Sequence, residues 1–151
     1  MKICLICVEI FAWGKYGGFG RSTRMLGREF TRLGHEVTAV VPRRHEQKPV
    51  EILDGIRVLG FEPGRPFSAF DLFKEADADI YHSEEPSFGT YLAQLAMPSK
   101  KHLVTFRDTR DTHDWWLEFT YPSLSNLQVL SNFIYEDNYF VGHAVRHADK
   151  C

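Results

Sequence analysis

Three glycines near the N-terminus have the type and spacing of a phosphate-binding segment. Gly17, Gly18 and Gly20 lie between an apolar run and a stretch with helical periodicity. The first turn of a helix exposes unpaired backbone N–H groups and carries partial positive charge. Glycine also lets a ligand approach the backbone closely. We therefore expect these amides to form an anion site, with Arg21 adding a charge-assisted hydrogen bond.

Two other groups of polar side chains follow predicted strands. His82 ends the strand-like run 79–82, and Arg107 and Asp108 follow the run 102–106. Ligands of open α/β sheets bind at the carboxyl ends of parallel strands, so these residues are candidates for a site. His82 has the chemistry of an acid, a base or a hydrogen-bonding group. A half-buried structural histidine is the alternative.

A repeat of aspartates begins at Asp108 and continues at Asp111 and Asp114. Three carboxylates could hold a divalent metal. Arg107, Arg110 and His113 lie beside them, and we favour the alternative that the carboxylates form ion pairs with the two arginines. The aromatic residues that follow suit either a ligand site or a plain core, and both interpretations stay open: Trp115, Trp116, Phe119 and Tyr121.

Two motifs that resemble metal sites are predicted to be structural. Cys4 and Cys7 form a CxxC within a strand-like run, where residues three apart point to opposite faces. His143 and His147 are one helical turn apart but lack the glutamate of a zinc-protease motif, since position 144 is alanine. We expect packing or surface roles for all four, and an exposed Cys151.

Composition excludes several classes of protein. The 151 residues suffice for one domain with a real core. Residues 1–50 carry a net charge of +5 and residues 51–151 one of −7, but no Lys/Arg stripe predicts nucleic-acid binding. No apolar run is long enough to span a membrane and no signal-peptide pattern opens the chain. We expect a cytoplasmic protein, with a peripheral membrane contact still compatible.

The pattern of elements predicts an α/β fold. Runs at 2–8 and 36–41 indicate strands that flank a helix over 21–33, which Gly20 or Ser22 opens, and Asp54-Gly55 predicts the turn of a hairpin over 50–61. Further elements are expected as helices over 67–75 and 88–97, strands over 79–82 and 102–106, a helical turn over 115–119, and one or two helices over 125–148. Together they predict a single doubly wound, Rossmann-like three-layer domain with a mostly parallel sheet.

A dinucleotide site is the rival interpretation of the glycine segment. Thr23 stands where the fingerprint needs its last glycine, and no acid follows the second strand. Arg43 and Arg44 could instead mimic a site for a 2′-phosphate, so an NADP-linked oxidoreductase domain is one alternative. A non-catalytic nucleotide- or sugar-binding module is another.

Several stretches in order resemble the N-terminal domain of family 4 retaining glycosyltransferases of GT-B architecture. The first is MKICLIC…YGGFGRSTRMLGREFTRLGHEVTAVVPR, over residues 1–43; later ones are ADIYH over 78–82, LVTF over 103–106 and HAD over 147–149. The resemblance covers nearly the whole chain. It departs from the family pattern at Arg107, where the family commonly has a histidine close to the transferred sugar.

The resemblance implies an enzyme that moves a sugar from a nucleotide-sugar donor to an acceptor hydroxyl, with no metal ion or other cofactor. It implies that residues 1–151 form the acceptor-side domain and that the C-terminal donor domain is absent. The chain alone is then expected to have no transferase turnover. The implied partners are the nucleotide-sugar, a sugar or lipid-linked acceptor, and a donor domain in cis or in trans. His82, Arg107 and Asp108 are then expected at the acceptor or cleft edge, and Gly17, Gly18, Gly20 and Arg21 at the donor diphosphate.

Overall fold

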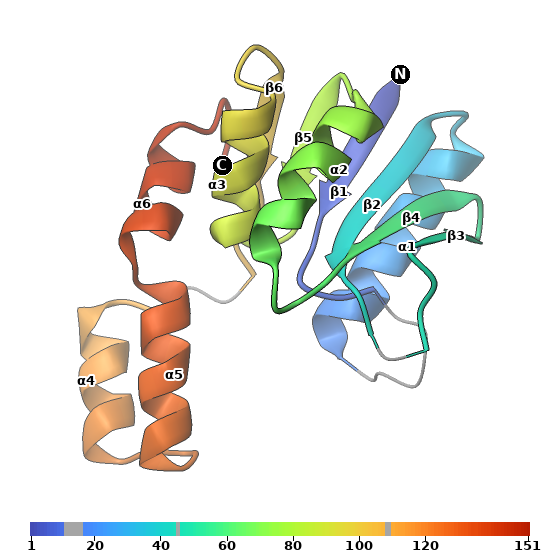
Figure 1. Ribbon diagram of the computed structural model, residues 1–151. Coiled ribbons are helices and arrows are strands. Elements are labelled where there is room, and N and C mark those ends of the chain that lie inside the picture. Colours follow the sequence, from blue (N-terminus) through green and yellow to red (C-terminus); the bar gives the residue numbers. More distant parts are fainter. Residues whose placement is uncertain (11–16, 45, 108–109) are drawn as a thin grey trace.

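A computed structural model describes residues 1–10, 17–44, 46–107 and 110–151. Within them a six-stranded sheet has the spatial order β3-β4-β2-β1-β5-β6 (Figure 1). All neighbouring strands are parallel except β3 and β4, which are antiparallel. The strands are β1 Lys2–Ile6, β2 Glu36–Pro42, β3 Val50–Leu53, β4 Ile56–Phe61, β5 Ile80–Ser83 and β6 Lys101–Val104. The mostly parallel sheet with one hairpin is therefore confirmed.

Helices cover both faces of the sheet. Helix α1 (Gly18–Arg32) packs through Leu26 and Phe30 on one face, and α2 (Ala69–Ala76) and α3 (Phe88–Ala96) pack on the other. A 3-10 turn, η1 (Pro66–Ser68), precedes α2. Apolar residues fill both interfaces because the central strands are buried on both sides, as is usual for parallel sheets. The expected three-layer α/β architecture is thus present.

The two cysteines of the CxxC motif lie in different cores. Cys4 belongs to the cluster under α2 and α3, and Cys7 belongs to the cluster under α1. Both thiols are buried, and burial raises the pKa of each thiol well above its ordinary value. The prediction that this motif is structural is confirmed, and Cys151 is exposed as expected.

The hairpin turn forms where the sequence predicted it. Asp54 and Gly55 have φ angles of 54° and 83°, the left-handed conformations that a tight two-residue hairpin turn requires. Asp54 accepts a hydrogen bond of 2.6 Å from Nε of Arg24. The turn is thereby tied to α1 on the neighbouring face of the sheet.

The region predicted as one or two helices over 125–148 forms two, α5 (Asn126–Glu136) and α6 (Tyr139–Arg146). Asn138 separates them because it bonds to both. Its Nδ2 donates to the carbonyls of Ile134 and Tyr135 at the end of α5, and its Oδ1 accepts from the amides of Phe140 and Val141 at the start of α6. An asparagine that caps a helix in this way favours a break in the chain direction.

Helix α6 packs beside α3, while α4 (Thr112–Thr120) and α5 form a hairpin that stands away from the sheet on the side where β1 ends (Figure 1). Trp115 and Val129 are buried between the two helices, and the Trp115 and Phe119 rings contact the Phe133 ring. Trp115 is thus a core residue of the hairpin, and Trp116 and Tyr121 are exposed. None of the helices that the structure describes is long and apolar enough to cross a bilayer.

The chain beyond α6 returns to the sheet. Lys150 forms a parallel bridge with Leu103 of β6, and the amide of Val104 donates to the carbonyl of Lys150 at 3.0 Å. A single bridge to β6 therefore follows residues 147–149.

Candidate functional site

The carboxyl ends of β1, β5 and β6 bring together side chains from three distant parts of the sequence. The amide of Glu84, just after β5, donates to the carbonyl of Ile6 at 3.1 Å, and the amide of Thr105 donates to the carbonyl of Ser83 at 2.9 Å. These bonds extend the sheet beyond its regular strands. They place the residues that follow each strand along one edge, where open α/β sheets bind ligands.

A buried ion pair lies at this edge. Arg107 pairs with Glu84, whose side chain is only 3% exposed, against 22% for that of Arg107. Neither carboxylate oxygen of Glu84 has a hydrogen bond of normal geometry among the described residues, so the arginine is its described compensation. A buried carboxylate needs such a partner, because desolvation penalises an isolated charge severely.

Arg107 also contacts residues other than Glu84. Its Cζ lies 6.0 Å from the ring centroid of Phe19 in the first turn of α1, and its backbone amide donates to Oε2 of Glu85 at 3.1 Å. Burial lowers the pKa of this guanidinium. Together with the ion pair to Glu84, these two contacts join the segment after β6 to α1 and to the segment after β5.

His82 of β5 is the register partner of Leu5 in the neighbouring strand β1. Its Nε2 lies 2.8 Å from Oγ1 of Thr105. Its pKa is lowered, first by burial and then by the positive charge of Arg107. The imidazole therefore favours its neutral form near neutral pH, in which one ring nitrogen donates and the other accepts. Such a group can orient a hydroxyl or take up a proton.

The glycine segment differs in part from the prediction. Helix α1 begins at Gly18, not at Gly20 or Ser22, and Gly17 is its N-cap in an extended conformation. The amide of buried Gly20 donates to Oε1 of Glu9 at 3.1 Å. The first turn of α1 therefore binds a carboxylate of the chain itself, and the predicted external anion stays a prediction.

The fit of Glu9 against this helix end is close. A Cβ placed on Gly17 would lie 1.7 Å from Oε1 of Glu9, whereas one on Gly18 would meet no described atom within 4 Å. Gly17 thus gives the carboxylate room to approach, and Gly18 is exposed at the open side. Arg21 lines a surface hollow of about 270 Å³ together with Arg24, Arg28 and Asp54.

The aspartate repeat is used differently from the prediction. Asp111 and Asp114 form a reciprocal capping box at the start of α4, in which each side chain accepts from the other's amide. Arg110 pairs with Glu136 of α5 at 3.1 Å. The expected ion pairing is therefore wrong for Asp111 and Asp114, because the helix N-terminus takes both carboxylates. Asp108 lies outside the described residues.

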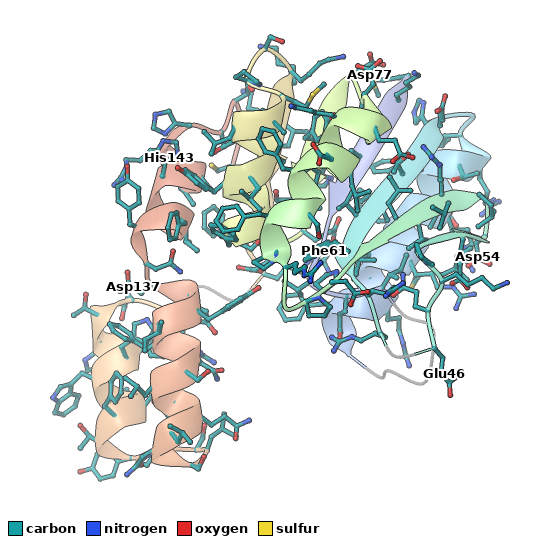
Figure 2. All side chains as sticks on the ribbon, viewed as in Figure 1. Glu46, Asp54, Phe61, Asp77, Asp137 and His143 are labelled. Carbon is teal, nitrogen blue, oxygen red and sulfur yellow. The ribbon has the colours of Figure 1, made fainter. Side chains whose placement is uncertain are left out.

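An apolar pocket adjoins the charged edge. It has a volume of about 200 Å³ and lies beneath the ends of β1, β2 and β4, beside α2 and α3. Phe61, labelled in Figure 2, lies in its wall. None of the described side chains that line it is charged, although Cys7 and Val8 of its wall directly precede Glu9.

The described part of the chain does not bring metal-ligating side chains together into a site. Among residues 1–10, 17–44, 46–107 and 110–151 no three His, Cys, Asp or Glu side chains are grouped so that they could hold an ion. His143 and His147 stack at 3.9 Å between ring centroids, and Nδ1 of His147 lies 2.9 Å from the carbonyl of His143. They have the packing roles that their sequence context predicted.

Sequence reasoning gave no role to Glu9 and did not predict the buried ion pair of Glu84, although the signal for each was present. Both are acidic residues directly beyond a predicted strand, at the edge where ligands bind. The prediction brought His82 and Arg107 to this edge but not the carboxylate that pairs with Arg107. It also began the helix at Gly20 or Ser22, whereas Gly18 and Gly20 both lie in the first turn of α1.

A doubly wound, mostly parallel α/β domain with charged side chains at its strand edge and an adjoining apolar pocket belongs to the Rossmann-like class of folds, which bind ligands at this edge. Comparison with protein-family models identifies the family. The chain belongs to Glycosyltransferase Family 4, whose model matches residues 16–145. A comparison with curated proteins found no significant match. The chain is thus a glycosyltransferase N-terminal domain.

Proposed function

We propose that the chain forms the acceptor-side half of a GT-B enzyme that transfers a sugar from a nucleotide-diphosphate donor to an acceptor hydroxyl. The observation that carries this proposal is the N-terminal end of α1, which opens at the strand edge and already binds one carboxylate, that of Glu9. A site that attracts a carboxylate through backbone N–H groups also attracts a diphosphate.

The proposed reaction breaks the bond between the sugar C1 and the diphosphate oxygen and forms a bond from C1 to the acceptor oxygen. Negative charge grows on the leaving diphosphate, so oriented N–H groups at Gly17, Gly18 and Gly20 stabilise the transition state more than the ground state. This charge stabilisation by backbone amides is why we propose metal-independent transfer. Retention of configuration is proposed from the family resemblance.

Glu9 has a definite place in this proposal. Its carboxylate and the donor diphosphate compete for the amide of Gly20, so the diphosphate binds when the carboxylate moves away from the helix end. The electrostatic interaction of one charge with a helix terminus is worth about 0.3–1 kcal/mol at an exposed site. Removal of that competing charge should therefore raise diphosphate affinity about two- to fivefold.

The acceptor is proposed to bind near His82 and Arg107. Neutral His82 can hold or accept a proton from the acceptor hydroxyl, and Arg107, bound to Glu84, supports the edge on which the acceptor rests. Asp108 is proposed at the same edge from the sequence alone. Arg107 occupies the position where the family commonly has a histidine, so we assign it a positioning role. A donor domain, in cis or in trans, is proposed to complete the cleft. The enzyme is proposed to act in the cytoplasm.

The experiment is a calorimetric titration of the chain with UDP, GDP, ADP and NADPH. We expect at least one diphosphate to bind, and the isosteric Glu9→Gln variant to bind it two- to fivefold more tightly. Glu29→Gln, on the outer face of α1, is the matched control and should bind as the native chain does. Preferential binding of NADPH, or equal affinities in native chain and Glu9→Gln, would contradict the proposal.

A further inference from the structure

The hairpin of α4 and α5 has only a small core of its own. It stands away from the sheet (Figure 1). In these two helices, all of whose residues the structure describes, only Trp115 and Val129 are buried. The Trp115 ring meets the Phe133 ring at a centroid distance of 5.2 Å. Helices as short as these gain most of their stability by packing an apolar face on other elements, and two helices alone enclose little core.

A second set of apolar side chains gathers on one face of this hairpin. Successive residues of a helix point about 100° apart. Trp116 is therefore turned by this angle from the inward Trp115, and Leu130 is turned by the same angle from the inward Val129. The two helices run antiparallel, so equal rotations bring both side chains to the same side of the hairpin. We call this side the apolar hairpin face, and its residues are Trp116, Phe119, Leu127, Leu130 and Ile134.

The apolar hairpin face is large for a surface that is exposed to water. The exposed fractions of its five residues range from 45% for Leu130 to 78% for Leu127. Large apolar side chains bury roughly 150–250 Å² when fully enclosed, so these five leave about 500 Å² open. A patch of this size is at the upper end for a monomer. Two such patches together bury about 1,000 Å², the lower limit for a specific interface between proteins.

Charged side chains of the hairpin lie on its other side. Asp114 precedes the inward Trp115 and is turned away from the apolar face, where it caps the start of α4. Glu118 lies on the same side and accepts a hydrogen bond from the amide of Ser123 at 2.9 Å. In an interface with twofold symmetry the same patch is present on both subunits, so a charge on it would oppose a like charge. The apolar hairpin face carries none, and it is therefore complementary to itself.

The composition of the hairpin distinguishes a protein partner from a bilayer. Residues 111–138 contain five Asp or Glu and no Lys or Arg. Helices that lie on membranes instead carry Lys and Arg, which anionic lipids attract. An acidic hairpin of this kind is repelled by an anionic bilayer. An uncharged face with exposed Trp and Phe has the composition of the core of a protein–protein interface.

We propose that the apolar hairpin face binds a second copy of this chain, so that two α4–α5 hairpins pack across a twofold axis as a four-helix bundle. The partner's hairpin would enlarge the small core that Trp115 and Val129 form. Trp116 is expected to contribute most to the affinity, because buried tryptophans are the commonest hot spots of interfaces. This proposal is independent of the proposed sugar transfer.

The test is analytical ultracentrifugation of the chain from about 1 to 100 µM, the range in which a modest dimer dissociates. We expect the average mass to rise with concentration towards twice that of one chain. Trp116→Gln and Ile134→Glu should each raise the dissociation constant of the dimer at least tenfold. Ile52→Glu is the matched control, because Ile52 is an isoleucine of similar exposure on the edge strand β3, and it should associate as the native chain does.

Two further measurements keep the test decisive. Circular dichroism should show that the variants fold, and amide hydrogen exchange of the native chain needs no variant: exchange in α4 and α5 should slow as the concentration rises, while exchange in β1 and β2 stays unchanged. A chain that remains a monomer at 100 µM would overturn the proposal, and so would association that Ile52→Glu weakens and Ile134→Glu does not. Binding of the native chain to phosphatidylglycerol vesicles that Trp116→Gln abolishes would show that a bilayer, not a second copy, covers this face.

Discussion

Replacement of Arg107 by methionine should destabilise the chain through the carboxylate that it leaves behind. Glu84 is almost completely buried, and Arg107 is its described ionic partner. Removal of one member of a buried ion pair costs about 3–5 kcal/mol, because the remaining charge is desolvated and uncompensated. The converse variant, Glu84→Gln, should cost less, since the side chain of Arg107 keeps partial access to water.

The cost in Arg107→Met should depend on pH. Above the ordinary titration range of a glutamate, about pH 4.3, the unfolded chain ionises Glu84, whereas the variant can fold with this residue protonated. The folded variant then binds more protons than the unfolded chain, so its stability falls as pH rises, by up to about 1.4 kcal/mol per pH unit. A cost of 3–5 kcal/mol corresponds to about two to four pH units of this slope.

Urea denaturation at pH 5 and pH 8 measures both effects. The stability difference between native chain and Arg107→Met should be larger at pH 8 than at pH 5. The double variant Glu84→Gln/Arg107→Met should recover most of the loss and remove the extra slope, which gives a coupling free energy for the pair. A loss below 1 kcal/mol for Arg107→Met with no change of slope would refute the buried-pair argument.

Three further predictions test other contacts. Tyr81→Phe should cost about 1–3 kcal/mol of unfolding free energy, because the buried Tyr81 hydroxyl donates to the carbonyl of Phe73 at 2.7 Å and accepts from the amide of Ala78. Tyr139→Phe, at an exposed position, is the control and should change the stability little. An unchanged urea midpoint for Tyr81→Phe would contradict this prediction. The lowered pKa of His82 means that the unfolded chain takes up a proton near pH 6.5 before the folded chain does, so stability should decline as pH falls from about 6.5 towards the folded-state pKa; His82→Gln should flatten this part of the curve, and parallel curves would count against the assignment. Asn138→Ala should cost about 0.5–2 kcal/mol through the lost cap of α6, measurable by thermal denaturation, and a smaller loss would show that the α5–α6 break is maintained by packing alone.

Local chemistry made much of the fold predictable. The Asp54-Gly55 turn and the apolar runs of the parallel strands are local signals, and the structure has the corresponding elements. Gly34, just after α1, has a positive φ of 84°. The 24-residue helical stretch at the end was ambiguous in sequence because the role of Asn138 depends on bonds to both sides.

The site was less predictable because its electrostatics depend on long-range neighbours. Glu84 and Arg107 are separated by 23 positions in sequence, and only the β5–β6 pairing makes them partners. The carboxylate of Glu9 reaches Gly20 only because the segment after β1 returns towards the helix end. The packing of the α4–α5 hairpin was also beyond local reasoning, since it depends on contacts of Trp115 and Phe119 with Phe133.

The central claim is that the first turn of α1 binds the diphosphate of the sugar donor. The most direct measurement is a series of ¹H–¹⁵N correlation spectra of the chain during titration with the diphosphate that binds most tightly. We predict that the amide signals of Gly17, Gly18 and Gly20 shift most and saturate together, and that they do so at lower ligand concentration in Glu9→Gln. Unmoved glycine amides, with the largest shifts in a different part of the chain, would contradict the account.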